Sequence, residues 1–119
     1  PAGLVEPGEA MTDAAVREFH EETGLHLKVI PADDMYTKPR FTTVGMTDEA
    51  CGMVYGYASG VPDNRFEESS EDIQVVLADK KEVRRILKEE NVAMMCAYML
   101  LHFLKSEGDP LGFVEMKDK

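Results

Sequence analysis

The segment from Gly3 to Leu25 constrains this chain more than any other part of it. It reads as a glycine, five residues, a glutamate, seven residues, and then Arg-Glu-apolar-x-Glu-Glu-x-Gly-apolar. On a helix, Glu18, Glu21 and Glu22 would direct their carboxylates toward one side. Like charges at this spacing destabilise an isolated helix by roughly a few tenths of a kcal/mol per pair. Because a hard cation with oxygen ligands offsets this repulsion, the spacing indicates a metal site rather than a solvated acidic face.

Local signals around these glutamates predict where the helix begins and ends. Thr12 or Asp13 can cap its first turn, since a side-chain oxygen there accepts a hydrogen bond from an unpaired amide. The helix is expected to run through the third glutamate and to stop at Gly24, which suits the left-handed position after a helix. Arg17 lies four residues before Glu21, so its planar guanidinium can hold that carboxylate in place.

The complete pattern resembles the Nudix box, the signature of hydrolases that cleave nucleoside diphosphates linked to another moiety. The resemblance implies an α/β fold, a Nudix-type α/β/α sandwich with a mixed sheet. It also implies a site for Mg²⁺, with Mn²⁺ as the alternative, in which Arg17 and Glu22 serve catalysis and Glu9 supports the site. The implied metal ligands are the backbone carbonyl of Ala2 and the carboxylates of Glu18, Glu21 and Glu22. Such a metal would neutralise the diphosphate and lower the pKa of an attacking water.

Two later segments resemble parts of one branch of that family, the ADP-ribose pyrophosphatases. Residues 43–49 are similar to a Ser-Pro-Gly-x-(Ser/Thr)-Asp-Glu loop, with Val44 in place of the proline. The implied substrate-binding residues are Gly45, Met46, Asp48 and Glu49. The Glu71-Asp72-Ile73 step resembles the one that carries the general base, so Glu71 is the expected base, with Glu67 and Glu68 as alternatives.

The resemblance therefore implies hydrolysis of ADP-ribose to AMP and ribose 5-phosphate. A diphosphatase for another substrate, such as a UDP-sugar, stays open. So does a binding or regulatory Nudix-type module that senses a nucleotide sugar without turnover. The metal-ligand glutamates of the box are all present, which favours the enzyme.

Composition narrows the possible partners and the compartment. The net charge of −10 argues against nucleic acid or an anionic membrane surface as partner. Cys51 and Cys96 are too few for a disulfide framework and are expected to be free thiols in a reducing compartment. No stretch approaches eighteen apolar residues and no leader precedes the box, so the expected location is the cytoplasm.

The remaining pattern predicts a mixed order of strands and helices. Expected strands are His26–Ile30, Met35–Thr37, Cys51–Ala58 and Ile73–Leu77. One helix is expected from Asp79, whose spacing to Glu82 is that of a capping box, and a second one from a cap at Asn91. Residues 106–119 are expected to form a loosely packed tail.

The position of the box within the chain carries one further expectation. Nudix proteins have several strands before this motif, and here it begins at Gly3. Residues 1–105 are therefore expected to form a partial, N-terminally incomplete Nudix domain with the box at 3–25. Such a domain would need the missing segment or a second copy in a homodimer to cover its sheet edge, and its activity alone would be in doubt.

Overall fold

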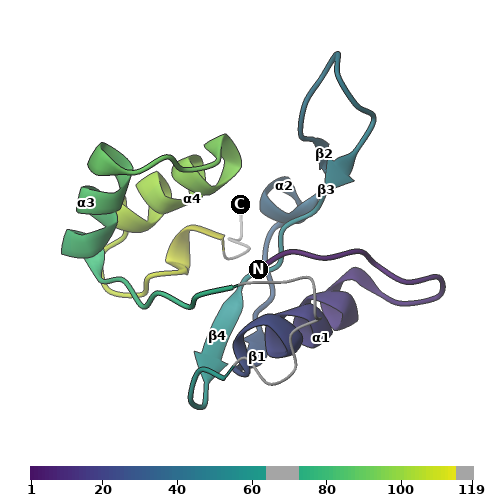
Figure 1. Ribbon diagram of the computed structural model, residues 1–119, viewed down its shortest axis with the longest axis horizontal. Coiled ribbons are helices and arrows are strands. Elements are labelled where there is room, and N and C mark those ends of the chain that lie inside the picture. Colours follow the sequence, from purple (N-terminus) through teal and green to yellow (C-terminus); the bar gives the residue numbers. More distant parts are fainter. Residues whose placement is uncertain (64–72, 115–119) are drawn as a thin grey trace.

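The computed structural model describes residues 1–63 and 73–114, which contain both helices and short strands (Figure 1). The helices are α1 (Met11–Thr23), α2 (Asp34–Thr37), α3 (Lys80–Glu89) and α4 (Met94–Lys105), followed by the 3-10 turn η1 (Gly112–Val114). The strands are β1 (His26–Val29), β2 (Arg40–Phe41), β3 (Ala50–Cys51) and β4 (Gly56–Ser59). The expected combination of helices and strands is confirmed.

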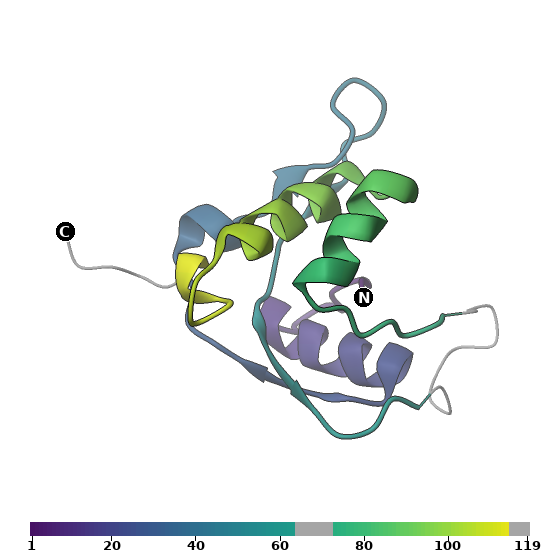
Figure 2. The ribbon, with the colours of Figure 1, turned by 90° about the vertical axis from the view of Figure 1, so that its left-hand side faces the viewer.

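The strands of the described residues form two small antiparallel sheets where the resemblance implied one mixed sheet. β1 pairs with β4, with His26 opposite Ser59, and β2 pairs with β3, with Arg40 opposite Cys51. α1 packs along β1, while α3 packs on α4 on the other side of the molecule (Figures 1 and 2). Among the described residues, no helix combines the length and the apolarity needed to cross a bilayer.

The box helix ends where the sequence predicts. Gly24 has a φ of 75°, and its amide donates to the carbonyl of His20 at 2.8 Å. The predicted start is wrong in detail, because Ala10 is the N-cap residue and no side chain caps the helix. Neither Thr12 nor Asp13 therefore acts as the cap.

Three other predicted elements differ from the structure. Met35–Thr37 belongs to α2, because the Asp33 side chain accepts the Met35 amide at 3.0 Å and caps a helical turn. Only the two ends of Cys51–Ala58 are strand, as parts of β3 and β4. Ile73–Leu77 is not assigned as a strand. The Asn91 cap is also wrong, since α4 starts later, with Ala93 as its N-cap residue.

The buried core of the described residues is small, and the molecule is open. The buried apolar side chains are Ala14, Leu25, Val83 and Val114. The radius of gyration is 15.0 Å, against about 13.5 Å for a compact chain of this length. Val114 is fully buried, and its carbonyl accepts the Asp33 amide at 2.8 Å, so the loose packing expected from Ser106 onward does not extend to η1.

Candidate metal centre

Arg17, a half-buried residue of α1, is the point at which Glu9, Glu18 and Glu21 meet. Its guanidinium contacts both carboxylate oxygens of Glu9, at 2.9 and 3.0 Å. It also donates to Glu18 at 2.9 Å and reaches Glu21 at 3.5 Å. A further bond, of 3.1 Å, goes to the carbonyl of Leu4. The arginine therefore ties two glutamates of the helix to the loop that precedes it.

These contacts stabilise the charged forms of Glu9 and Arg17. The hydrogen bond from Arg17, helped by the Glu6 amide, lowers the pKa of Glu9 to about 2. The bonds to Glu9 and Glu18 raise the pKa of Arg17 in turn. The carboxylate of Glu9 is thus ionised at neutral pH, where it balances the guanidinium.

Glu22 differs from its neighbours because it is buried, with only 6% of its surface exposed. Its carboxylate accepts the amide of Ala2 at 3.1 Å. The backbone at Gly3 lies equally close to the helix, since a Cβ on that residue would overlap the carboxylate end of Glu18. The structure thereby brings Ala2 and Gly3 to the carboxylates with which the sequence grouped them.

The donor set fits a hard divalent cation. It consists of carboxylate oxygens from Glu18, Glu21 and Glu22, with the backbone of Ala2 beside them, and Mg²⁺ takes oxygen ligands of this type. In the described residues, no three acidic, histidine or cysteine side chains are already gathered as a metal cluster. A cation would have to draw Glu18 and Glu21 away from the Arg17 guanidinium that now holds them.

A second arginine with three carboxylates provides a contrast. On α3, Arg85 contacts Glu82, Glu89 and Glu90 at 2.6, 3.2 and 2.8 Å. All of these side chains are at least 40% exposed, which is ordinary for a solvated helix surface. The box differs in having one buried carboxylate and a backbone segment packed against the helix.

Comparison with known proteins now identifies the family. The family model described as "NUDIX domain" matches residues 1–98. The chain belongs to the Nudix family. Nudix hydrolases generally use a divalent metal such as Mg²⁺, in agreement with the oxygen donors on α1.

Two curated proteins are similar to this Nudix domain. "Putative nudix hydrolase 2" of Caenorhabditis elegans is 36% identical over 86 residues, which cover 67% of this chain. "Putative 8-oxo-dGTP diphosphatase" of Bacillus subtilis is 44% identical over 41 residues, or 34% of this chain. The chain spans only 37% and 28% of the lengths of these two relatives. No solved structure matches.

The predicted substrate loop of the Nudix domain lies away from α1. Gly45, Met46, Asp48 and Glu49 lie in the exposed turn between β2 and β3, which projects from the body of the molecule (Figures 1 and 2). The hydrogen bonds found for this loop stay within the hairpin, such as Thr42 to Glu49 at 3.2 Å. The structure does not bring these residues to the carboxylates, and their role in substrate binding stays a prediction.

The predicted base, Glu71, and the alternatives Glu67 and Glu68 lie outside the described residues. Asp63, the last described residue before them, sits at the C-terminal end of α1, where its amide donates to the Thr23 carbonyl at 2.7 Å. Sequence reasoning did not find this contact, because it joins residues 40 positions apart. The only sequence signal for it is Gly24, whose lack of a side chain permits the approach.

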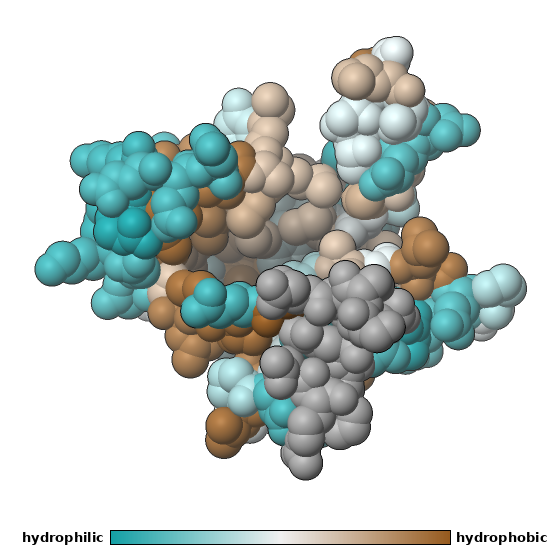
Figure 3. All heavy atoms as spheres, viewed as in Figure 1, coloured by the Kyte–Doolittle hydropathy of each residue, from teal (hydrophilic) through white to brown (hydrophobic). Residues whose placement is uncertain are grey.

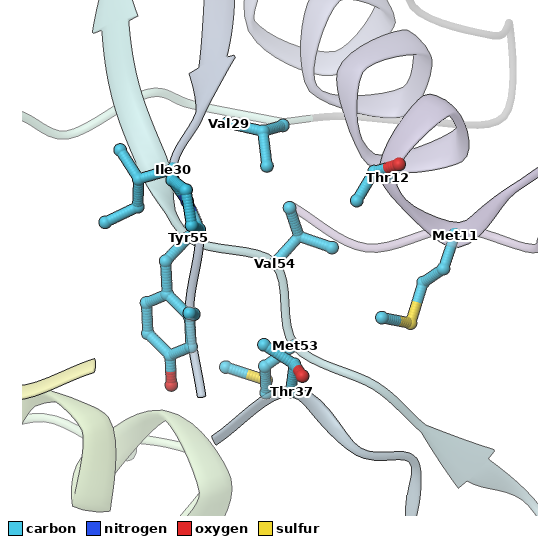
Figure 4. Close-up of a pocket in the computed structure, with 10 residues that line it drawn as sticks. Met11, Thr12, Val29, Ile30, Thr37, Met53, Val54 and Tyr55 are labelled. Carbon is cyan, nitrogen blue, oxygen red and sulfur yellow. The ribbon is translucent and has the colours of Figure 1, made fainter. Parts of the chain in front are cut away.

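An apolar cavity of about 360 Å³ lies at the other end of the helix (Figure 4). Its walls come from the start of α1, the end of β1, α2 and residues 53–55, and include Met11, Val29, Met53 and Tyr55. Burial raises the pKa of Tyr55. No charged side chain of the described residues lines the cavity, so it is not suited to hold a diphosphate.

Proposed function

We propose that this Nudix domain carries the metal-binding part of a Mg²⁺-dependent hydrolase, with Mn²⁺ as an alternative metal. The reaction would cleave the diphosphate of a nucleoside diphosphate linked to another moiety. The observation that carries the proposal is the buried carboxylate of Glu22, held by the Ala2 amide beside the glutamates around Arg17. Glu22 lies beside the carboxylates of Glu18 and Glu21 on the same helix, and clustered carboxylate oxygens are the ligands that Mg²⁺ takes, which supports a cation site.

In this proposal each residue has a distinct task. A bound metal supplies charge neutralisation of the diphosphate and a lowered pKa of its bound water. Glu18, Glu21, Glu22 and the backbone carbonyl of Ala2 would hold the metal. Arg17 keeps the carboxylates close together before binding and offsets their mutual repulsion. Glu71, with Glu67 and Glu68 as alternatives, would orient the attacking water.

ADP-ribose is the substrate that we propose first, with AMP and ribose 5-phosphate as products. Support comes from residues 43–49 and from the Glu71-Asp72-Ile73 step, both of which resemble segments of ADP-ribose pyrophosphatases. An oxidised nucleotide is the second candidate, because the Bacillus subtilis relative is named for 8-oxo-dGTP. A UDP-sugar is a third, and a nucleotide-sugar-binding module without turnover is the alternative outside catalysis.

A substrate panel tests the proposal. The chain is incubated with Mg²⁺ and ADP-ribose, a UDP-sugar or 8-oxo-dGTP, and products are separated by liquid chromatography. We expect AMP from ADP-ribose, with a loss of about 100-fold or more in Glu71→Gln, as for removal of a general base. Glu22→Gln should lose at least as much, while Glu89→Gln, an exposed glutamate of α3, should keep full activity.

The other possible outcomes would show which part of the proposal is wrong. Full activity in Glu22→Gln would overturn the metal-site assignment. Full activity in Glu71→Gln alone would move the base to Glu67 or Glu68. Binding of ADP-ribose in a calorimeter without turnover of any substrate would favour the non-catalytic module.

A further inference from the structure

Residues 106–114, which we term the strap, run from the C-terminal end of α4 to the beginning of α2 (Figure 2). At the start of the strap, the Ser106 hydroxyl donates to the Phe103 carbonyl at 2.6 Å, and the Ser106 carbonyl accepts the Lys80 ammonium group. Lys80 is the first residue of α3, and its nitrogen lies 5.9 Å from the centre of the Phe103 ring. The strap is thus bonded at its start to both helices of the α3–α4 pair.

Polar contacts also join the strap to the part of the molecule formed by α1, α2, β1 and β4, which we term the sheet unit. The Tyr57 hydroxyl of β4 donates to the Asp109 carboxylate at 2.5 Å, and the same oxygen accepts the Leu111 amide at 3.0 Å. The Asp33 amide, at the beginning of α2, donates to the Val114 carbonyl at 2.8 Å. The far end of the strap is therefore bonded to two places on the sheet unit.

The Phe113 ring lies between these polar contacts and meets an aromatic ring from each of three elements. Tyr36 of α2 and Tyr55, which precedes β4, approach it edge-on at 5.7 and 5.9 Å between ring centres. His102 of α4 stacks on it at 5.3 Å. Edge-on and stacked pairs at these separations are favourable. One side chain of the strap thus touches both α4 and the sheet unit.

Direct polar contacts between the α3–α4 pair and the sheet unit are absent from residues 1–63 and 73–114. The closely packed element pairs lie within each part, since α3 packs on α4, α1 packs on β1, and β1 pairs with β4. The hydrogen bonds and ion pairs of α3 and α4 lead to residues of the pair, to Glu90 between them, or to the strap. In Figure 3, the surface is hollowed between the α3–α4 side, at left, and the β2–β3 hairpin, at upper right. The strap therefore supplies the hydrogen bonds that connect the two parts.

We propose that the strap fixes the α3–α4 pair to the sheet unit and undocks as one piece while the sheet unit stays folded. Segments with few buried contacts open at a lower free energy than the core, and Val114 is the one buried side chain of the strap. The Gly112 amide donates to the Asp109 carbonyl and the Val114 amide to the Leu111 carbonyl, each at 3.1 Å. Because these bonds hold residues 109–114 together, the contacts of the strap with the sheet unit are lost together. The docked strap sets the position of α3 and α4 relative to α1, the helix of the proposed metal site.

Amide hydrogen exchange of the 119-residue chain, measured by nuclear magnetic resonance, tests the undocking. The Asp33 amide reports on the strap, because its acceptor is the Val114 carbonyl. The Ile30 amide reports on the sheet unit, because it donates to the Tyr55 carbonyl at 3.0 Å. We expect Phe113→Ala to accelerate exchange at Asp33 about 30-fold or more, the effect of deleting a half-buried ring that contacts three others. Exchange at Ile30 should stay at its native rate.

Two other variants complete this experiment. Phe41→Ala is the matched control, because Phe41 is 65% exposed, and it should leave both amides unchanged. Tyr57→Phe removes the hydroxyl that bonds to Asp109 and keeps the ring, so exchange at Asp33 should rise about 10-fold. Native exchange at Asp33 in both Phe113→Ala and Tyr57→Phe would overturn the docking role of the strap. Equal acceleration at Asp33 and Ile30 would overturn undocking as a separate piece.

Double electron–electron resonance tests whether the strap holds the α3–α4 pair. Spin labels are attached at Val16→Cys on α1 and Lys88→Cys on α3, both exposed positions, in a chain with the two native cysteines changed to serine. We expect one narrow distribution of label distances in this chain and in its Phe41→Ala form, and a broad distribution in its Phe113→Ala form. A narrow distribution in the Phe113→Ala form would overturn the role of the strap in fixing the pair.

Discussion

Replacing Gly24 by alanine tests the close contact between the end of the box helix and Asp63. The φ of Gly24 is 75°, and an alanine in that region costs about 1–2 kcal/mol relative to right-handed backbone. The added Cβ would also lie 2.6 Å from the Cβ and the carbonyl oxygen of Asp63 and 2.7 Å from its nitrogen. Two of these are backbone atoms, and the Asp63 amide is bonded to Thr23 at 2.7 Å. Overpacking of this kind adds about 1–3 kcal/mol.

Gly8 supplies the control for that experiment. Its φ is 78°, but a Cβ there would meet nothing within 4 Å. In urea unfolding followed by circular dichroism, Gly8→Ala should lower the free energy of unfolding by about 1–2 kcal/mol and Gly24→Ala by about 2–5 kcal/mol. Equal losses in the two variants would refute the close contact between Gly24 and Asp63.

Two further predictions concern stability. Thr23 is buried, donates to the Phe19 carbonyl at 2.6 Å and accepts the Leu25 amide at 3.1 Å, so Thr23→Val should lower the unfolding free energy by about 1–3 kcal/mol. Thr23→Ser should keep most of it, and a valine variant as stable as the serine variant would contradict the role of the hydroxyl. Because the pKa of Glu9 falls from 4.5 to about 2 on folding, its stabilising contribution is complete above pH 4.5 and is lost as the pH falls toward 2. The difference in melting temperature between the native chain and Glu9→Gln should therefore be present at pH 7 and vanish near pH 2; a difference independent of pH would exclude the ion pair with Arg17 as its cause.

The elements that the sequence predicted correctly depend on neighbours in the chain. Gly24 ends α1 because its φ of 75° is left-handed and does not continue a right-handed helix. α3 begins after Asp79 because that side chain accepts the Glu82 amide at 2.8 Å. Helix ends of this kind involve only three or four residues, so a local pattern is sufficient to find them.

The elements that failed depend on distant partners or on stronger local competitors. A strand at Ile73–Leu77 needs a neighbouring strand for its backbone hydrogen bonds, and the alternation of side chains does not provide one. At Met35–Thr37, the apolar pattern predicted a strand, but the cap supplied by Asp33 stabilises a helical turn instead. Tertiary context thus decided the first case and a side-chain cap decided the second.

The candidate site was also predictable only where its contacts join residues close together in the chain. Helical spacing placed Glu21 near Arg17, and that contact occurs at 3.5 Å. The contact of Arg17 with Glu18, its neighbour in the chain, was not predicted. The bonds of Arg17 to Glu9 and Leu4 depend on how the preceding loop folds back, with the Glu9 amide donating to the Glu6 carbonyl at 3.0 Å. Helix geometry alone contains no information on that path.

Titration with Mn²⁺, followed by the electron paramagnetic resonance signal of the free ion, tests the central claim most directly. We expect the native chain to bind Mn²⁺ and the triple variant Glu18→Gln, Glu21→Gln, Glu22→Gln to lose this binding. The matched control changes Glu82, Glu89 and Glu90 to glutamine, which removes the same charge around Arg85, and it should bind like the native chain. Equal binding by the native chain and the box variant, or equal losses in the two triple variants, would contradict a metal site on α1.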